Sequence, residues 1–251
     1  MMRRFCGILF GVLCAGSLAW GGQPTASWEG LVGLYTQPTA ETVTDHQVLL
    51  TFSEIRFTES NSVNRVEDTW FSGSLTYIPA PRWETALTWR HERVDQFLES
   101  QAGPIAHLDK NEITGHFKYV LQPVEPDRLG LAVGMMDVAN ATDEVEGLET
   151  NRGRRFFLVG TYNWAHLGVT YDNHGSGVYF GARWSVTDNL ELLGEYVVSP
   201  TFVQTTPLPT NSVNFNLGVR FYPRELPNLR FDMTAVGDSN FNYGFSLSYM
   251  L

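Results

Sequence analysis

The sequence has no long run of apolar residues after its N-terminus, very little cysteine and a shortage of basic residues. A helix that spans a membrane needs roughly 18 or more predominantly apolar residues, so the mature chain is not expected to cross a bilayer as a helix. The only cysteines are Cys6 and Cys14, which excludes a disulfide framework from the rest of the chain. The formal net charge of −10 argues against nucleic acid as a partner. No zinc-ligand spacing, P-loop or dinucleotide fingerprint occurs, so we expect no metal and no cofactor.

The first 21 residues have the pattern of a secretory signal peptide. Arg3 and Arg4 supply a positive start, Phe5–Cys14 is an apolar core, and small residues follow near Ala19. A membrane anchor would need a longer apolar run, and a lipoprotein at Cys14 would need a smaller residue before it. We therefore predict a cleaved signal peptide (1–21), an N-terminal periplasmic or plug-like segment (22–45) and a β-domain (46–251). Export to the bacterial outer membrane is the expected localisation.

Side chains alternate between apolar and polar with period two through most of the remaining chain, which is typical of β-strands. In Gly177–Val198, for example, Val178, Phe180 and Trp184 share one face, whereas Gly181 and Arg183 share the other. The pattern predicts twelve strands: His46–Phe57, Trp70–Ile78, Trp83–Val94, Glu112–Gln122, Arg128–Val138, Arg155–Asn163, His166–Asp172, Gly177–Val186, Leu190–Val198, Ser212–Tyr222, Asn228–Val236 and Phe241–Leu251.

The connections between these strands alternate between short and long. The long ones are Thr58–Thr69, Asp95–Asn111, Ala139–Arg154 and Ser199–Asn211. Short periplasmic turns and longer outer loops are typical of outer-membrane barrels. A soluble β-sandwich would also alternate, but it explains neither the leader nor the alternating connections. We therefore predict an all-β fold, an antiparallel transmembrane β-barrel of about 12 strands, with its apolar face in lipid.

The first predicted strand departs from this pattern. Val48, Leu50 and Phe52 share their face with Glu54 and Arg56, and charged side chains on a lipid-facing surface are unfavourable. The sequence therefore predicts either a β-bulge or an early exit from the bilayer at this point.

Aromatic residues near strand ends are typical of the girdles at the two membrane interfaces. The predicted girdle residues are Trp70, Trp83, Trp164, Trp184 and Tyr249. The last strand also contains Asn242, Gly244, Leu247 and Tyr249 in a spacing that resembles the C-terminal assembly signal of outer-membrane barrels. That resemblance implies the barrel assembly machinery as a partner.

Charged residues of both signs occupy the predicted inner face of the last strands: Arg183, Glu191, Glu195, Arg220, Arg230 and Asp232. Arg183 is expected diagonally opposite Glu191 and Glu195, within reach of both. Because the signs balance, the sequence predicts a mutually neutralising ladder rather than a filter of one sign. In a barrel of intermediate size such a ladder either narrows the lumen or tunes its selectivity.

Two further patterns suggest chemistry. His174-Gly175-Ser176 is similar to the His-x-Ser pair of outer-membrane phospholipase A and lipid A deacylase, in which histidine is the base for serine. Here Gly177 replaces the expected asparagine, and a turn residue is the simpler interpretation. The predicted outer loops also carry carboxylates, densest at Asp143–Glu149, which favour a solvated surface or cation bridging to lipopolysaccharide phosphates.

The segment Glu29–Val43 (EGLVGLYTQPTAETV) resembles the N-terminal motif of the YjbH-type outer-membrane proteins tied to exopolysaccharide biosynthesis. The matching residues are Gly30, Gly33, Leu34, Pro38, Thr39 and Ala40. The resemblance implies a non-enzymatic accessory role in polysaccharide export, with polysaccharide as a partner. In physical terms, the segment either crosses the periplasmic mouth as a small plug or leads into the first strand.

Three functions follow from these patterns. The leading hypothesis is a non-enzymatic barrel, accessory to exopolysaccharide secretion or envelope integrity, in contact with outer-membrane lipid and lipopolysaccharide. The alternative is a narrow porin for small solutes. The third is a lipid acyl hydrolase that uses His174 and Ser176.

Overall fold

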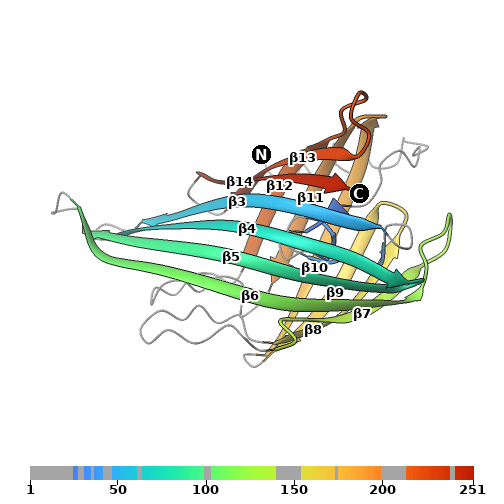
Figure 1. Ribbon diagram of the computed structural model, residues 1–251, viewed down its shortest axis with the longest axis horizontal. Helices are drawn as coiled ribbons and strands as arrows, with labels where there is room; N and C mark the ends of the chain where they lie inside the picture. Colours follow the sequence, from blue (N-terminus) through green and yellow to red (C-terminus); the bar gives the residue numbers. More distant parts are fainter. Residues whose placement is uncertain are drawn as a thin grey trace, which may run out of the picture.

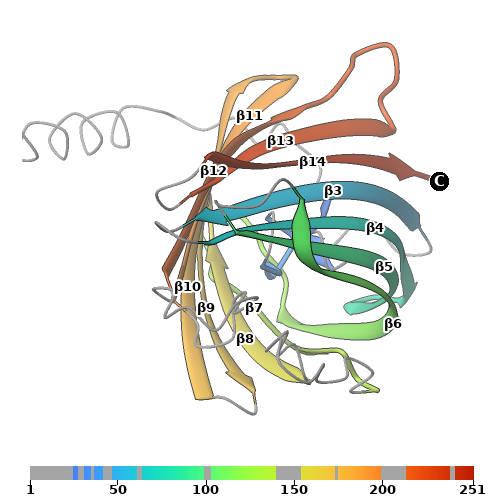
Figure 2. The ribbon, with the colours of Figure 1, turned by 90° about the vertical axis from the view of Figure 1, so that its left-hand side faces the viewer.

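The chain forms a closed β-barrel with a short N-terminal segment inside it (Figures 1 and 2). The computed structural model describes residues 25–27, 31–34, 37–41, 47–60, 64–98, 103–139, 154–172, 175–198, 213–237 and 241–251. Twelve antiparallel strands, β3 to β14, form the wall, which closes where β14 pairs with β3. The predicted all-β barrel of about 12 antiparallel strands is thereby confirmed. No helix in the described residues is long and apolar enough to cross a membrane.

The strands vary in length. Their bounds are β1 (Thr25–Ala26), β2 (Val32–Gly33), β3 (Val48–Ser60), β4 (Asn64–Ala80), β5 (Trp83–Leu98), β6 (Pro104–Gln122), β7 (Gly130–Met136), β8 (Arg155–Tyr162), β9 (Ala165–Asp172), β10 (Gly175–Thr187), β11 (Leu190–Val198), β12 (Val213–Phe221), β13 (Leu229–Gly237) and β14 (Phe241–Met250). The short β1 and β2 pair with each other in a separate small sheet.

Strands β3 to β6 extend well beyond the rest of the barrel at one end (Figure 1). The predicted outer loops Thr58–Thr69 and Asp95–Asn111 are therefore wrong in large part, because most of their residues pair in these strands. The projecting parts are mainly polar, since a strand above the bilayer needs no lipid-facing apolar row. Apolar periodicity thus marks where these strands leave the bilayer rather than where they end. The other two predicted loops, 139–154 and 199–211, lie outside the described residues, except for residues 139 and 154.

The two faces of the wall differ as the alternation predicts. Large apolar side chains point outward; Phe52, for example, is 63% exposed. Residues between them point inward, and Asn216 and Thr234 are buried. The pairing of β3 with β4 is continuous from Val48 to Ser60, so the structure has no β-bulge at Glu54 and Arg56. An early exit from the bilayer there stays a prediction.

Aromatic side chains lie at both ends of the apolar band. Near the short turns, Trp83 contacts the rings of Tyr119 and Phe117, with centroids 4.8 and 5.9 Å apart. At the other boundary, His91 stacks between Phe71 and Trp89. The girdle prediction is wrong for Trp70. This side chain points into the barrel, is only 5% exposed and lies beside the guanidinium of Arg90.

The main hydrophobic core lies inside the barrel, where N-terminal residues meet the inner wall. It contains Leu31, Ala40, Ala86, Val120, Ala132, Met136, Phe157, Val159, Tyr179 and Val197. A Cβ atom on Gly168 would collide with the ring of Tyr179, and one on Gly181 would collide with Leu34. Glycine at these two positions gives the large side chains room inside the lumen. The interior is therefore partly filled by the N-terminal segment.

Candidate functional site

We call the described part of residues 25–41 the inner segment. A tight turn shapes its centre: Leu34 donates its backbone N–H to the carbonyl of Gln37 at 3.0 Å, and Gly33 pairs with Pro38. A Cβ on Gly33 would collide with the Gln37 carbonyl oxygen, so the turn requires glycine there. Leu34 is buried against the wall. This turn is therefore built by three residues of the predicted N-terminal motif, Gly33, Leu34 and Pro38. Gly30 of the same motif lies outside the described residues.

Two wall side chains donate hydrogen bonds to carbonyls of the inner segment. The Tyr179 hydroxyl on β10 donates to the carbonyl of Pro38 at 2.9 Å. The Lys118 ammonium on β6 donates to the carbonyl of Glu41 at 2.7 Å. Both wall side chains are fully buried. These contacts satisfy backbone groups that would otherwise be buried without partners.

Two backbone N–H groups of the inner segment donate to the wall in turn. Gln37 donates to the Glu195 carboxylate on β11, and Ala40 donates to the Thr161 hydroxyl on β8, each at 3.0 Å. The inner segment is thus fixed to four strands of the barrel: β6, β8, β10 and β11. Its own backbone, and not only its side chains, occupies the lumen.

An ion pair between Glu41 and Arg183 completes this attachment. The Arg183 Nη2 atom lies 2.6 Å from Glu41 Oε1, and Nη1 lies 3.3 Å from Oε2. The Thr39 hydroxyl also donates to Glu41 Oε2 at 3.3 Å. A two-pronged guanidinium–carboxylate contact is directional as well as strong. Both charged side chains are largely buried, so the pair is poorly screened by solvent.

The predicted charge ladder lies on the inner wall, with different partners from those expected. Arg220 donates two hydrogen bonds to Asp232, at 2.8 and 2.9 Å. Arg183 has its Nε atom 3.7 Å from Glu191 but bonds mainly to Glu41. The expected contact between Arg183 and Glu195 is replaced, because the Glu195 carboxylate accepts from the inner segment and from Asn216.

Two tyrosine contacts complete the ladder. The Tyr222 hydroxyl donates to Glu191 at 2.6 Å. The guanidinium of Arg230 lies over the Tyr222 ring, 5.4 Å from its centroid, and donates to the Asn228 carbonyl at 3.2 Å. The buried charges are therefore held in place by neutral neighbours as well as by each other.

Charge is balanced on the other side of the lumen too. Lys118 and Glu84 form a fully buried pair at 2.7 Å, and Arg90 lies 3.5 Å from Glu112. Positive and negative side chains both line the described inner wall, so the lumen does not present a field of one sign.

Of the remaining sequence candidates, the structure describes Ser176, Asp188 and Asn189. Ser176 is exposed at the start of β10, and His174 lies outside the described residues. Asp188 and Asn189, the positions expected to orient that histidine, lie in the turn at the opposite end of the strand. Asp143–Glu149 is outside the described residues, and the described residues contain no cluster of three or more potential metal ligands.

The C-terminal residues of the proposed assembly signal divide between the two faces of β14. Leu247 and Tyr249 point outward, whereas Asn242 and Gly244 point inward. Asn242 accepts a hydrogen bond from the backbone N–H of Thr58 on β3 at 2.6 Å. This contact helps close the barrel between its first and last strands.

Several lumen residues were not singled out from the sequence. Glu84 and Lys118 follow the inward alternation of their strands, so the face pattern of β5 and β6 offered a signal for them. Glu41 offered no such signal, because it precedes the first wall strand in a segment without clean periodicity. Its partner is 142 residues away in the sequence.

No protein-family model matches this sequence, and no curated protein matches it. Solved structures do resemble it. An outer membrane channel from Pseudomonas putida F1 superposes with a TM-score of 0.51 at 12% identity, over 84% of this chain and 98% of that chain. The transport unit of the autotransporter AIDA-I from Escherichia coli gives a TM-score of 0.45 at 8% identity, over 86% of this chain and 92% of that chain. The likeness to the Pseudomonas putida F1 channel shows that the fold is that of an outer-membrane barrel.

Proposed function

We propose that this protein is an outer-membrane channel for small solutes and that the inner segment holds it closed at rest. The similar channel from Pseudomonas putida F1 supports the channel part of this proposal, as do the outward apolar and inward polar faces of the wall. Barrels with exposed apolar bands of this kind are stable only in lipid or detergent.

One observation carries the proposal: the backbone of residues 37–41 crosses the lumen and is hydrogen-bonded to the inner wall. A typical hydrogen bond contributes roughly 0.5–1.5 kcal/mol net. A few such contacts hold the inner segment in place at rest, but a modest force or the binding of a ligand is enough to release it. The attachment is thus suited to a closed state that opens.

The exopolysaccharide role implied by the family resemblance remains a prediction. In this proposal the motif residues Leu34, Pro38 and Ala40 have a direct physical task, which is to seat the inner segment against the wall. That task serves a channel whatever its solute is. We therefore place the channel function first.

The test is conductance of refolded protein in planar lipid bilayers. Wild type is expected to conduct weakly and in brief openings, whereas a variant that lacks residues 22–40 is expected to conduct steadily. A reversible control uses Ala40→Cys with Thr161→Cys, whose backbone N–H and hydroxyl are 3.0 Å apart. A reducible cross-link between the two should silence the channel, and reduction should restore it. Failure of all these proteins to conduct, despite heat-modifiable folding on gels, would refute the channel function.

A further inference from the structure

The inner wall of β14, β3, β4 and β5 is lined with hydroxyl groups. We call this set the hydroxyl panel: Thr51, Ser53, Ser72, Ser74, Thr76, Thr88, Ser246 and Ser248. The pairing registers arrange seven of them in two rows that run across the strands. Ser246, Ser53 and Ser72 form one row, and Ser248, Thr51, Ser74 and Thr88 form the other.

Most anchors of the inner segment lie on strands other than those of the hydroxyl panel. In the ring of twelve strands, β14, β3 and β4 are three to six positions away from β8, β10 and β11. Strand β1 of the inner segment comes close to β3, and Figure 2 shows β1 and β2 beneath β3 and β4 inside the ring. The described anchors of the inner segment thus lie mostly away from the panel, whereas β1 lies close to it.

The panel contains buried hydroxyls that lack a partner in the described part of the chain. Ser53 and Ser74 are each only 6% exposed, and neither Oγ atom has a hydrogen-bond partner there. Thr51 and Ser248, by contrast, bond to each other at 2.9 Å. A buried hydroxyl is unfavourable unless something accepts or donates to it. In the closed barrel these two Oγ atoms are also inaccessible to solvent. A group in the lumen, either water or a polar solute, reaches them once the inner segment is released.

The chemistry of the panel defines the class of solute. Its members are uncharged donors and acceptors. Charged residues at its edges have partners on the wall. Asp232, beside Ser246, binds Arg220, and Arg230, beside Ser248, donates to the Asn228 carbonyl. Arg90, beside Ser72, lies near Glu112. Successive weak hydrogen bonds of this kind allow a solute to enter and to leave.

We propose that, once the inner segment is released, small uncharged polar solutes cross the lumen along the hydroxyl panel; this rests on the proposed channel function. The path ends toward the short turns at a buried apolar cluster of Leu49, Ile78 and Met250. Each of these residues lies two positions beyond a panel residue on its own strand. The cluster narrows the path. Conduction is therefore controlled by the entry of water into this apolar constriction.

Cysteine substitution tests this path directly, since the only native cysteines are Cys6 and Cys14 and both can be replaced by serine. Ser74→Cys and Ser53→Cys are near-isosteric changes that should preserve the fold. Reaction with a hydrophilic methanethiosulfonate reagent should lower conductance severalfold. A cationic reagent should shift the residual current toward anions, and an anionic reagent should shift it toward cations. Liposome swelling should be faster with the neutral sugar arabinose than with gluconate.

A matched control defines the outcome. Leu75→Cys lies next to Ser74 but points outward. Reagents should leave its conductance unchanged. A conducting wild type whose Ser53→Cys and Ser74→Cys variants are indifferent to the reagents would overturn the path and leave the channel function intact. Equal entry of gluconate and arabinose would overturn the solute class. Absence of conductance even without residues 22–40 would refute the channel function, and the path with it.

Discussion

Replacing Glu41 by glutamine should open the channel without unfolding the barrel. The change removes the charge that Arg183 holds at 2.6 Å, in a pair that is largely buried. Loss of one member of a buried pair costs about 3–5 kcal/mol when the other is left alone. Arg183 keeps Glu191 at 3.7 Å, and an amide oxygen still accepts one hydrogen bond, so the smaller figure for a charged hydrogen bond, about 1.5–3 kcal/mol, applies.

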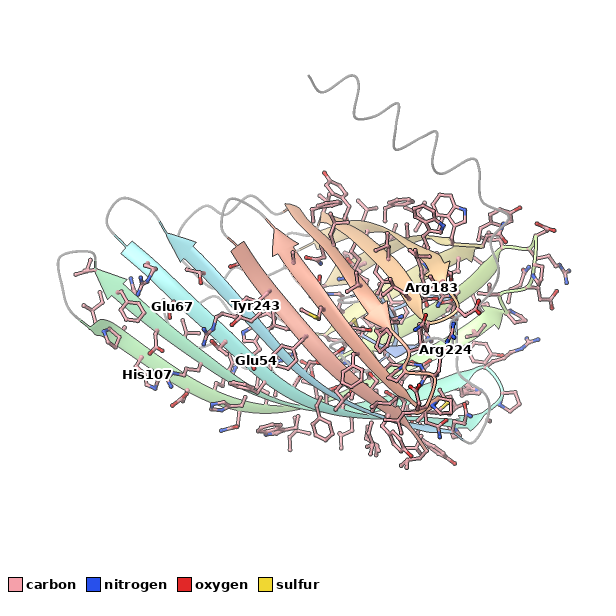
Figure 3. All side chains as sticks on the ribbon, turned by 90° about the horizontal axis from the view of Figure 1, so that it is seen from above. Glu54, Glu67, His107, Arg183, Arg224 and Tyr243 are labelled. Atoms are coloured by element: carbon pink, nitrogen blue, oxygen red, sulfur yellow. The ribbon has the colours of Figure 1, made fainter. Side chains whose placement is uncertain are left out.

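This free energy is lost from the closed state alone. Since each 1.4 kcal/mol is about a factor of ten, the ratio of closed to open channels should fall about 10- to 100-fold. The assay is the open probability of single channels in planar bilayers, with Glu67→Gln as the control. Glu67 lies near the far end of the projecting strands (Figure 3) and pairs with the half-exposed Arg65 at 3.2 Å, a surface contact worth about 0–1 kcal/mol. An open probability that is equal in the two variants would refute the reasoning.

Two arginine variants separate release of the inner segment from loss of wall charge. Arg183→Ala removes the partner of Glu41 and should raise the open probability, as Glu41→Gln does. Arg220→Ala leaves the inner segment attached but frees the buried carboxylate of Asp232, so the current that remains should become cation-preferring. Combining the two substitutions should give a conductance that is both larger and cation-selective. An unchanged wild-type pattern in the double variant would mean that neither group limits conduction.

Three further predictions concern other parts of the molecule. Phe231→Arg, on the outward face, should destabilise the barrel by about 2–4 kcal/mol in chemical denaturation, whereas Thr234→Arg, which faces the lumen, should not; equal tolerance would reverse the faces. Ser176→Ala should leave envelope lipids unchanged in mass spectrometry, and loss of an acyl-hydrolase activity would instead support the enzyme hypothesis. Hydrogen bonds to Asp95 and Asp109 raise the pKa of His107 in the projecting strands. The stability that these bonds contribute is complete below the pKa of this histidine in the unfolded chain, and it is lost as the pH rises through its pKa in the folded barrel. Amide hydrogen exchange in the projecting strands, corrected for its intrinsic dependence on pH, should therefore accelerate as the pH rises through the folded-state pKa of His107. An exchange rate that does not change with pH would contradict a stabilising role for these hydrogen bonds.

The fold was largely predictable because a strand in a bilayer must place apolar side chains on its lipid-facing side, which gives its sequence an alternation with period two. Phe215 must face lipid and Asn216 must not, so each lipid-spanning strand carries its own face assignment in the sequence. The same reasoning fails above the bilayer, where β5 and β6 pair through polar residues without an apolar row. It also fails for Trp70, since an aromatic residue near a bilayer boundary faces inward or outward according to its strand phase.

The candidate site was predictable only where its partners are neighbours on adjacent strands. Arg220 and Asp232 are directly opposite in the register of β12 and β13, so strand alternation alone brings them to one face and one level. No such rule connects Glu41 with Arg183. That contact depends on the three-dimensional path of a segment that carries no strand periodicity, and it becomes visible only when the barrel is closed around it.

The attachment of the inner segment also dictates an order of folding. Its wall partners lie far along the chain: Pro38 is 141 residues before Tyr179, and Gln37 is 158 residues before Glu195. Contacts between such distant residues form late, because the chain must first lose the entropy of closing the intervening loop. The residues of the inner segment are therefore among the last to reach their final positions, after β11 has joined the sheet. A newly inserted barrel passes through a stage with an empty lumen, and its permeability should fall with time as the N-terminus docks.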